Sequence, residues 1–391
     1  KGTRLVLRLK RQLFPCHRQL NNSCLPHHPP PPSRSKAGTV PDPSAEIPSA
    51  APTGFVPIRV PESLAVLGAA RLLGAGTRSG AAKRMMTAAA VHGIDLSMMW
   101  ATVDRALDGR PVRVREVCLA VPGSGRTVVL LVGEPADGGV GDRGHKERVQ
   151  CIGAACRHLQ GEREWVLAQT LPEPTQRPTV SAFEEAGFRR VGELATMRRG
   201  VEPVTPPLES EWPEGIVVRT VRGRNDRPPA DEAALLVQAL DRSYADTLDC
   251  PELCGLRDTP DVLESHRCTG EWDGKLWWLV LWRGEPHGCM LFSRIPEQGS
   301  VELVYLGLSP ELRNKGLGKL LLPLGLSAAV RTASTHIMCA VDVRNAPARK
   351  LYGRFGFRES GRRLAMVKPL SGPDGGVVHN AASTPDRPQS H

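Results

Sequence analysis

The sequence predicts an α/β fold with a mixed sheet, arranged as two tandem halves. Apolar, β-rich runs alternate with runs of helical periodicity along most of the chain. A segment near the middle of the chain recurs near its end without a gap. In that repeat Gly187 aligns with Gly356 and Phe188 with Phe357. A proline-rich stretch between the two copies supplies a natural linker.

The repeat and the composition set the expected boundaries. Both ends of the chain are rich in Pro, Ser and polar residues, and the first segment is also basic, so we expect them to be disordered. The expected parts are a disordered segment at 1–52, an N-terminal half at 53–200, a linker at 201–214, a C-terminal half at 215–370 and a disordered tail at 371–391.

Within the N-terminal half, periodicity and turn residues predict two helices and three strands. The two strands at 112–121 and 127–132 are joined by a turn at Gly123-Ser-Gly125. The expected helices are 61–73 and 147–159, and the third strand is 164–170.

The same reading of the C-terminal half predicts a longer alternation. Asn345 is a good N-cap, and Gly356 is a good terminator for the helix between them. The expected strands are 216–221, 276–282, 288–293, 301–308, 335–342 and 357–369, and the expected helices are 230–244, 319–330 and 346–355.

Charge and hydropathy exclude several classes of protein. The chain has 391 residues and a formal net charge of +10. Residues 1–50 hold eight Lys/Arg and two Asp/Glu, so +6 lies there and +4 remains for the rest. A nearly neutral globular part argues against nucleic-acid binding. Without a run of 18 apolar residues or a secretory signal, we expect no membrane span and a cytoplasmic protein.

The ten cysteines are scattered, which fits a reducing compartment better than a disulfide framework. The densest group is Cys250-x3-Cys254 followed by His266 and Cys268. Its spacing is not that of a zinc finger or ribbon, so we expect no metal site.

The stretch from Val301 to Val330 has the strand–loop–helix order of a phosphate-binding motif. An apolar strand leads into a loop with Arg313, Lys315 and two glycines, and an apolar helix follows directly. The first N–H groups of a helix have no internal partner, and the helix dipole makes that end positive. Glycines let the backbone approach an anion closely. The spacing matches neither a P-loop nor a Rossmann loop.

Two motifs in this half resemble those of a known superfamily. The loop contains Arg313-x-x-Gly316-x-Gly318, and the later segment 345–357 carries Tyr352 four residues before its glycine. Together they resemble the signature of the GNAT N-acetyltransferase superfamily over roughly 215–370, and the tandem arrangement resembles the mycothiol synthase family. For the loop alone, the alternative is an ordinary glycine-containing turn.

The resemblance implies an acetyl-CoA cosubstrate and a set of site residues. Tyr352 is the implied general acid for the leaving thiolate, and Glu302, fourteen residues before Gly316, matches the position of a base glutamate. The implied contacts to the oxyanion, pantetheine and phosphates are Leu306, Gly307, Leu308, Arg313, Asn314, Lys315, Gly316, Leu317, Gly318, Lys319 and Asn345.

Structural alternatives remain for both catalytic candidates. Glu302 is also compatible with a surface carboxylate on a strand, and Tyr352 with a core tyrosine on an amphipathic helix. Asp249 or Glu252 could act as the base through water instead.

The N-terminal half departs from the pattern where chemistry is expected. Phe183 stands at the position of Tyr352, and the loop 137–144 lacks the Arg-x-x-Gly-x-Gly spacing and carries two carboxylates. We therefore expect a degenerate GNAT-like half with a structural or acceptor-shaping role.

The expected function is transfer of acetyl from acetyl-CoA to a primary amine on a small molecule or peptide. The alternative is a non-catalytic module that binds acyl-CoA as a sensor or interaction domain, and a longer acyl donor also stays open. The sequence does not identify the amine.

Overall fold

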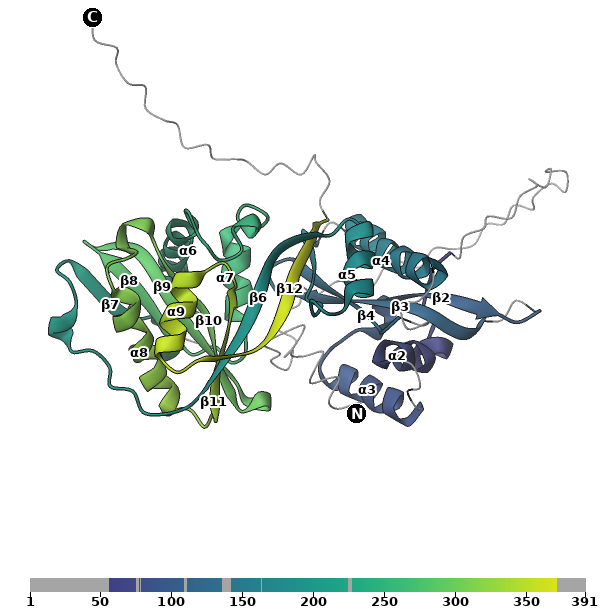
Figure 1. Ribbon diagram of the computed structural model, residues 1–391, viewed down its shortest axis with the longest axis horizontal. Helices are drawn as coiled ribbons and strands as arrows, with labels where there is room; N and C mark the ends of the chain where they lie inside the picture. Colours follow the sequence, from purple (N-terminus) through teal and green to yellow (C-terminus); the bar gives the residue numbers. More distant parts are fainter. Residues whose placement is uncertain are drawn as a thin grey trace, which may run out of the picture.

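The computed structural model describes residues 56–370, apart from 75–76, 78, 109–110, 136–141, 163 and 224–226. The expectations for 1–52 and 371–391, and for most of the loop 137–144, lie outside these residues. Figure 1 shows two lobes joined by continuous strands.

Within the described residues, a single mixed sheet of twelve strands runs through both lobes, in the order β1-β2-β3-β4-β5-β12-β6-β11-β10-β9-β8-β7. The pairs β4–β5 and β10–β11 are parallel and the other neighbouring pairs are antiparallel. The strands are β1 (Ile58–Arg59), β2 (Met99–Arg105), β3 (Pro111–Gly123), β4 (Thr127–Val132), β5 (Leu167–Thr170), β6 (Arg189–Gly200), β7 (Ile216–Thr220), β8 (Trp277–Trp282), β9 (Glu285–Ile295), β10 (Ser300–Leu308), β11 (His336–Asp342) and β12 (Arg358–Pro369).

In the N-terminal half, helices cover both faces of the sheet. Alternate residues of a strand point to opposite faces, and here Leu119 joins one apolar core while Ala120 joins another. The first core lies under α2 (Ala65–Leu73) and α3 (Ser79–Val91), and the second under α4 (Asp142–Glu162) and α5 (Arg177–Glu185). The expected helices near 61–73 and 147–159 are present, whereas α3 and β2 were not predicted.

The C-terminal half has the same layering. Phe292 points to one face, where its ring would meet a Cβ at Gly325 of α8 (Leu317–Val330). Tyr305 points to the other face, where its hydroxyl lies 2.7 Å from Ser243 Oγ of α6 (Ala230–Tyr244). The remaining helices are α7 (Thr259–Arg267) and α9 (Ala346–Arg354). All six expected strands and three expected helices of this half are found, within one to three residues at most ends.

The internal repeat predicted from sequence is confirmed at the level of structure. The elements α5 and β6 of the first half have the same lengths and relative positions as α9 and β12 of the second. Gly187 and Gly356, the aligned glycines, both have a positive φ, +88° and +79°, after their helices. The chain is therefore a tandem duplication of one α/β unit.

The last strand of each half is exchanged with the other half. β6 of the first half pairs with β11 of the second, and β12 of the second pairs with β5 of the first. β6 and β12 also pair with each other, and Figure 1 shows them crossing between the lobes. The sheet of each half is completed by a strand from the other half.

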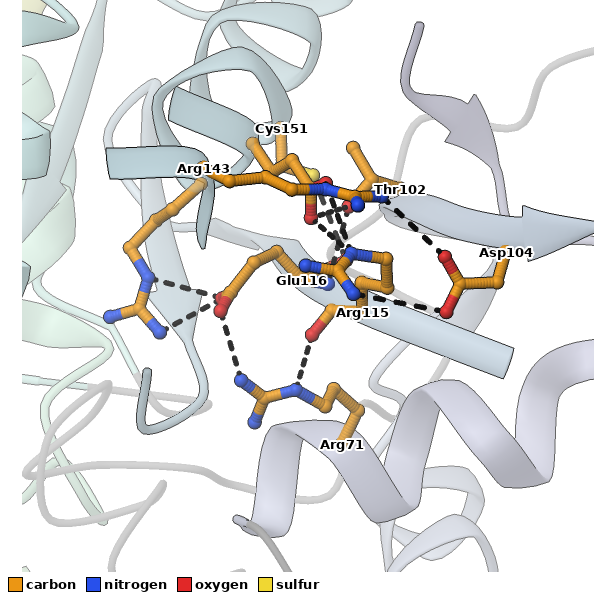
Figure 2. A network of polar contacts seen from close by, with 9 residues as sticks. Arg71, Thr102, Asp104, Arg115, Glu116, Arg143 and Cys151 are labelled. Carbon is orange, nitrogen blue, oxygen red and sulfur yellow. Dashed lines mark hydrogen bonds and ion pairs between the residues drawn. The ribbon is translucent and has the colours of Figure 1, made fainter. Parts of the chain in front are cut away.

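The interior of the N-terminal half holds a network of buried charges (Figure 2). Glu116 accepts from Arg148 at 2.9 Å and from Arg71 at 3.1 Å. Glu147 accepts from Arg115 at 2.8 Å. Glu116, Glu147 and Arg148 are each at most 2% exposed, so water does not solvate their charges. Each charge is stabilised by its oppositely charged partners instead.

Candidate active site

The site begins where the two parallel strands of the C-terminal half separate. β10 and β11 pair from Ser300 with His336 to Leu303 with Cys339, and there the pairing ends. The register of β10 against β9 also shifts between Leu303 and Tyr305, which makes Val304 a β-bulge. A bulge bends its strand and redirects the following side chains. The backbone of β10 beyond Val304, including Leu306 to Leu308, is therefore unpaired on the side of β11.

The predicted phosphate loop lies between the end of β10 and the start of α8. Gly316 is the N-cap of α8 with φ +81°, and no side chain among the described residues caps the helix there. A Cβ built on Gly316 meets nothing within 4 Å, so the space before the first amides is open. Asn314, Lys315 and Lys319 are exposed around this end. Open glycine backbone, a free helix N-terminus and two cations fit a diphosphate.

Arg313 holds this loop in place through its side chain. Its Nε donates to the Leu308 carbonyl at 3.0 Å, and its Nη atoms donate to the Asp246 and Ser243 carbonyls at 2.9 and 2.8 Å. The guanidinium thus links the end of β10 to the end of α6. This geometry supports a loop-positioning role for Arg313 more directly than the phosphate contact expected from sequence.

Lys315 has a partner that sequence reasoning missed. Its Nζ lies 5.4 Å from the centre of the Trp282 ring, and the Arg283 guanidinium lies 5.1 Å from the same ring. A cation over an aromatic face is attracted to its negative charge density. Trp282 lies at the far end of another hairpin, so only the three-dimensional structure connects it with the loop.

Glu302 is the carboxyl with the most strongly shifted pKa near the point where β10 and β11 separate. It pairs with Ser293 of β9 and Met338 of β11, and its side chain is directed to the face covered by α6 and α7. Burial raises the pKa of Glu302 to about 8. Within the described part of the chain, no ion pair or hydrogen bond of this carboxylate is found. A partly accessible carboxyl with such a pKa suits a general base better than a solvated surface group does.

Tyr352 lies on α9, on the opposite face of the sheet. The residue is 6% exposed, and burial raises the pKa of its phenol well above the ordinary value, with Cys339 and Asp249 adding to the effect. The phenol therefore stays protonated at neutral pH. Asn345 caps α9 as the sequence predicted, since its Oδ1 accepts from the Ala348 amide at 3.2 Å.

The two alternative bases differ clearly in their surroundings. Glu252 forms an ion pair with Arg344 at 2.6 Å, and that hydrogen bond lowers its pKa. Asp249 accepts from the Asp342 amide at 2.8 Å, and burial raises the pKa of its carboxyl. Asp249 also raises the pKa of both Tyr305 and Tyr352, which places it near the two phenols. Of these two carboxylates, Glu252 is held in its charged form by Arg344, whereas burial opposes ionisation of Asp249.

The fold is that of two GNAT-like domains in tandem. The chain superposes on a GCN5-related N-acetyltransferase from Sphaerobacter thermophilus with a TM-score of 0.52 and 18% identity, covering 83% of this chain and 98% of that one. That likeness establishes the fold. In the sequence comparison, residues 241–357 match the acetyltransferase (GNAT) family, so the C-terminal half contains a GNAT acetyltransferase domain.

Two curated relatives carry the name mycothiol acetyltransferase. The protein from Streptomyces bingchenggensis is 32% identical over 172 residues, which cover 44% of this chain and 53% of the relative. The protein from Streptomyces griseus subsp. griseus is 32% identical over 215 residues, which cover 55% of this chain and 64% of the relative. The matched regions thus span between half and two thirds of these relatives. No helix among the described residues has the length and apolar character needed to cross a membrane.

Proposed function

We propose that this chain is an acetyl-CoA-dependent N-acetyltransferase whose single active site lies in the C-terminal half. The observation that carries the proposal is the position of the catalytic candidates. Glu302 pairs with Met338 just before β10 and β11 diverge, and Tyr352 interacts electrostatically with Cys339, the last paired residue of β11. The same strand β10 leads to the open N-terminus of α8. A thioester between the strands would then have its phosphates at the helix and its carbonyl near both groups.

Each residue has a defined part in the proposed reaction. Glu302 takes a proton from the amine, directly or through water, as the nitrogen attacks the thioester carbonyl carbon. A backbone N–H in the segment Leu306 to Leu308 stabilises the resulting oxyanion, an interaction worth about 3–4 kcal/mol in other enzymes. The carbon–sulfur bond then breaks, and Tyr352 gives its proton to the departing thiolate. The products are an amide and coenzyme A, and the proton taken up by Glu302 returns through solvent to the Tyr352 phenolate.

The proposed cosubstrate contacts follow from the loop geometry. The amides of Leu317 and Gly318 lie at the start of α8, whereas the Lys319 amide donates to the Gly316 carbonyl at 2.9 Å. The side chains of Lys315 and Lys319 supply the positive charge. A Cβ at Gly318 would lie 3.0 Å from a methyl group of Leu351 of α9, so a larger residue there would require the Leu351 side chain to shift. Gly318 therefore allows the loop and α9 to pack together beside the cosubstrate.

The proposed acceptor is a primary amine on a small molecule or short peptide. The names of the curated relatives point to a small-molecule amine, since both are called mycothiol acetyltransferase. The residues proposed to face the acceptor on the α6 and α7 side are Asp249, Tyr305 and Glu302. Both carboxyls have a raised pKa, which suits proton uptake from the amine.

The test uses the full chain, because each half contributes a strand to the other. Calorimetric titration of acetyl-CoA into wild type, Gly316→Ala and Gly316→Glu separates backbone strain from charge at one site. We expect Gly316→Glu to bind at least about 10-fold more weakly than Gly316→Ala, because a carboxylate then opposes the phosphates. Turnover is measured as coenzyme A released, separated by chromatography, with glucosamine, spermidine and a tripeptide bearing a free α-amine. Tight binding without turnover on any amine would favour the sensor alternative.

A further inference from the structure

The turn between β3 and β4 of the N-terminal half lies against α7 of the C-terminal half. Arg257 Nη1 donates to the Gly125 carbonyl at 3.1 Å and to Ser265 Oγ at 2.8 Å. Ser265 Oγ lies 2.9 Å from the Ser124 carbonyl, toward which it can donate. The turn, defined here as residues Ser124–Arg126, is thus held by a helix that the other half contributes.

Gly125 is required at this contact for two reasons. Its φ is +67°, in the region that favours glycine. A Cβ at this position would also collide with the Asp261 carbonyl oxygen and Ser265 Oγ. Any larger residue must therefore move the turn away from α7. The close approach is a specific fit between the two halves.

Helix α7 connects this contact to the candidate active site. The ring of His266, next to Ser265, packs on the ring of Tyr305 with 5.4 Å between centroids and 31° between planes. Tyr305 follows Glu302 on the same face of β10 because of the bulge at Val304. Its ring also occupies the space that a side chain at Gly307 would fill. A displacement of α7 would thus reach the carboxyl and the backbone proposed to act on the thioester.

The wall formed by α7 and Tyr305 has a free polar position. His266 Nε2 is buried, and among the described residues no hydrogen-bond partner for it is found. Burial, with Arg257 adding to the effect, lowers the pKa of His266 to about 4, so the imidazole is neutral at physiological pH.

We propose that the turn Ser124–Arg126 of the N-terminal half is a positioning element for the amine side of the C-terminal active site. It sets the place of α7, and through His266 and Tyr305 it shapes the wall that receives the acceptor. The inference rests on the proposed acetyltransferase function. It assigns the N-terminal half a part in acceptor recognition and none in binding acetyl-CoA at the C-terminal loop.

The corresponding turn of the C-terminal half makes no such contact at its glycine. Register matches the β3–β4 turn to the β9–β10 turn, which contains Gly299. A Cβ built on Gly299 meets only Thr335 Oγ1, at 3.8 Å, within its own half. Of these two matched turns, the N-terminal one alone has its glycine against a helix of the other half.

The first test measures the contact itself in the full chain. Hydrogen–deuterium exchange is compared among wild type, Gly125→Ala, Ser265→Ala and the control Gly284→Ala. Gly284 has φ +85° in a two-residue turn, and a Cβ there meets nothing within 4 Å, so it carries the strain without the collision. We expect faster exchange over 259–267 in Gly125→Ala and, to a smaller degree, in Ser265→Ala. Unchanged exchange in both variants would overturn the proposal.

The second test separates positioning from mere structural support. With the best amine of the panel, we expect Gly125→Ala to raise KM for the amine by about 10-fold relative to Gly284→Ala, with the Kd of acetyl-CoA unchanged. Equal kinetics in the two variants would overturn the positioning role even if exchange differs. An equal loss of acetyl-CoA affinity would indicate general damage. If wild type acetylates no amine, the proposed function fails first, and the role in acceptor recognition falls with it.

Discussion

The two halves share one scaffold and differ at the positions where the chemistry is proposed. Strand register matches Val129 of β4, which pairs with Gln169, to Glu302 of β10, which pairs with Met338. Phe183 of α5 corresponds in the same way to Tyr352 of α9. Both N-terminal residues are buried in apolar cores. The N-terminal half therefore lacks the base and the acid together.

The strands themselves differ beside these positions. β10 has a bulge directly after Leu303, whereas β4 pairs with β3 from Thr127 to Val132 without a register shift. The parallel strands of the N-terminal half also separate, and a cavity of about 40 Å³ remains there, lined in part by Thr179 and Phe183. The parallel strands thus diverge in both halves, whereas the bulge at Val304 and the polar side chains of Glu302 and Tyr352 are features of the C-terminal half.

Substitution of Glu302, the proposed base, should give the largest change in activity among the differences between the two halves. Glu302→Gln, which removes the basic carboxylate but keeps its shape, is expected to lower kcat/KM by about 10²–10⁴-fold. In wild type, kcat/KM should rise with pH, and the midpoint of that rise should lie near the Glu302 pKa of about 8. The measurement is a pH–rate profile with saturating acetyl-CoA. A flat profile, or a Glu302→Gln enzyme of normal activity, would assign the base to Asp249.

The same carboxyl makes a second pH-dependent contribution, to stability. Its pKa is raised in the folded state, so the folded protein binds this proton more tightly than the unfolded chain does. The stabilisation is complete below the ordinary carboxyl pKa of about 4.3 and is lost as pH rises through about 8. Glu302→Gln should therefore gain thermal stability over wild type at pH 9 and show little difference at pH 5.

The acid position should give a smaller effect, because a thiolate leaves more readily than an amine does. Tyr352→Phe copies the N-terminal half and is expected to lower kcat by about 10²-fold, with the Kd of acetyl-CoA unchanged. The reciprocal Phe183→Tyr is the matched control, and it should leave kcat unchanged because Phe183 is far from Glu302 in the other lobe. Coenzyme A release at several pH values checks both variants. Normal turnover in Tyr352→Phe would return Tyr352 to a packing role.

The buried charges of the N-terminal half should affect stability and leave turnover nearly unchanged. Arg148→Met removes a charged partner of the buried Glu116 carboxylate. The free energy of unfolding is expected to fall by about 3 kcal/mol. Lys146→Met is the control on the same helix, because its pair with Asp142 is exposed, and it should not shift the denaturant midpoint. Urea unfolding of the full chain measures both. A large drop in kcat per folded molecule for Arg148→Met would break the separation of roles between the halves.

Sequence reasoning predicted most of the elements and the duplication. Strong periodicity and clear stops gave helices such as α6 with the observed bounds, and the aligned glycines of the repeat gave the tandem arrangement. It missed α3 and β2, because an Ala-rich helix and a short strand carry weak patterns. The bulge at Val304 was also out of reach, since one extra residue in an apolar run changes no local preference.

The relations between the halves were the least predictable features. The sequence pattern predicts that β6 is a paired strand, but it does not identify the partner. β11 and β5 are equally suited to pair with it, because they are copies of one unit. The turn that contains Gly125 was predicted from sequence, whereas its contact with α7 depends on the placement of both lobes. The Arg313 side chain was assigned from its charge, and its contacts with three carbonyls became visible only in three dimensions.

The exchanged strands have a consequence for the order in which the molecule can form. During synthesis β5 leaves the ribosome long before its neighbour β12, which is the last strand in the part of the chain that the structure describes. Contacts between residues far apart in sequence form slowly, because a long loop must close first. The edges of β5 and β6 thus stay unpaired until the C-terminal segment is made. Both lobes are completed by the same final event, and a nascent chain that stops before β12 exposes two open sheet edges to aggregation.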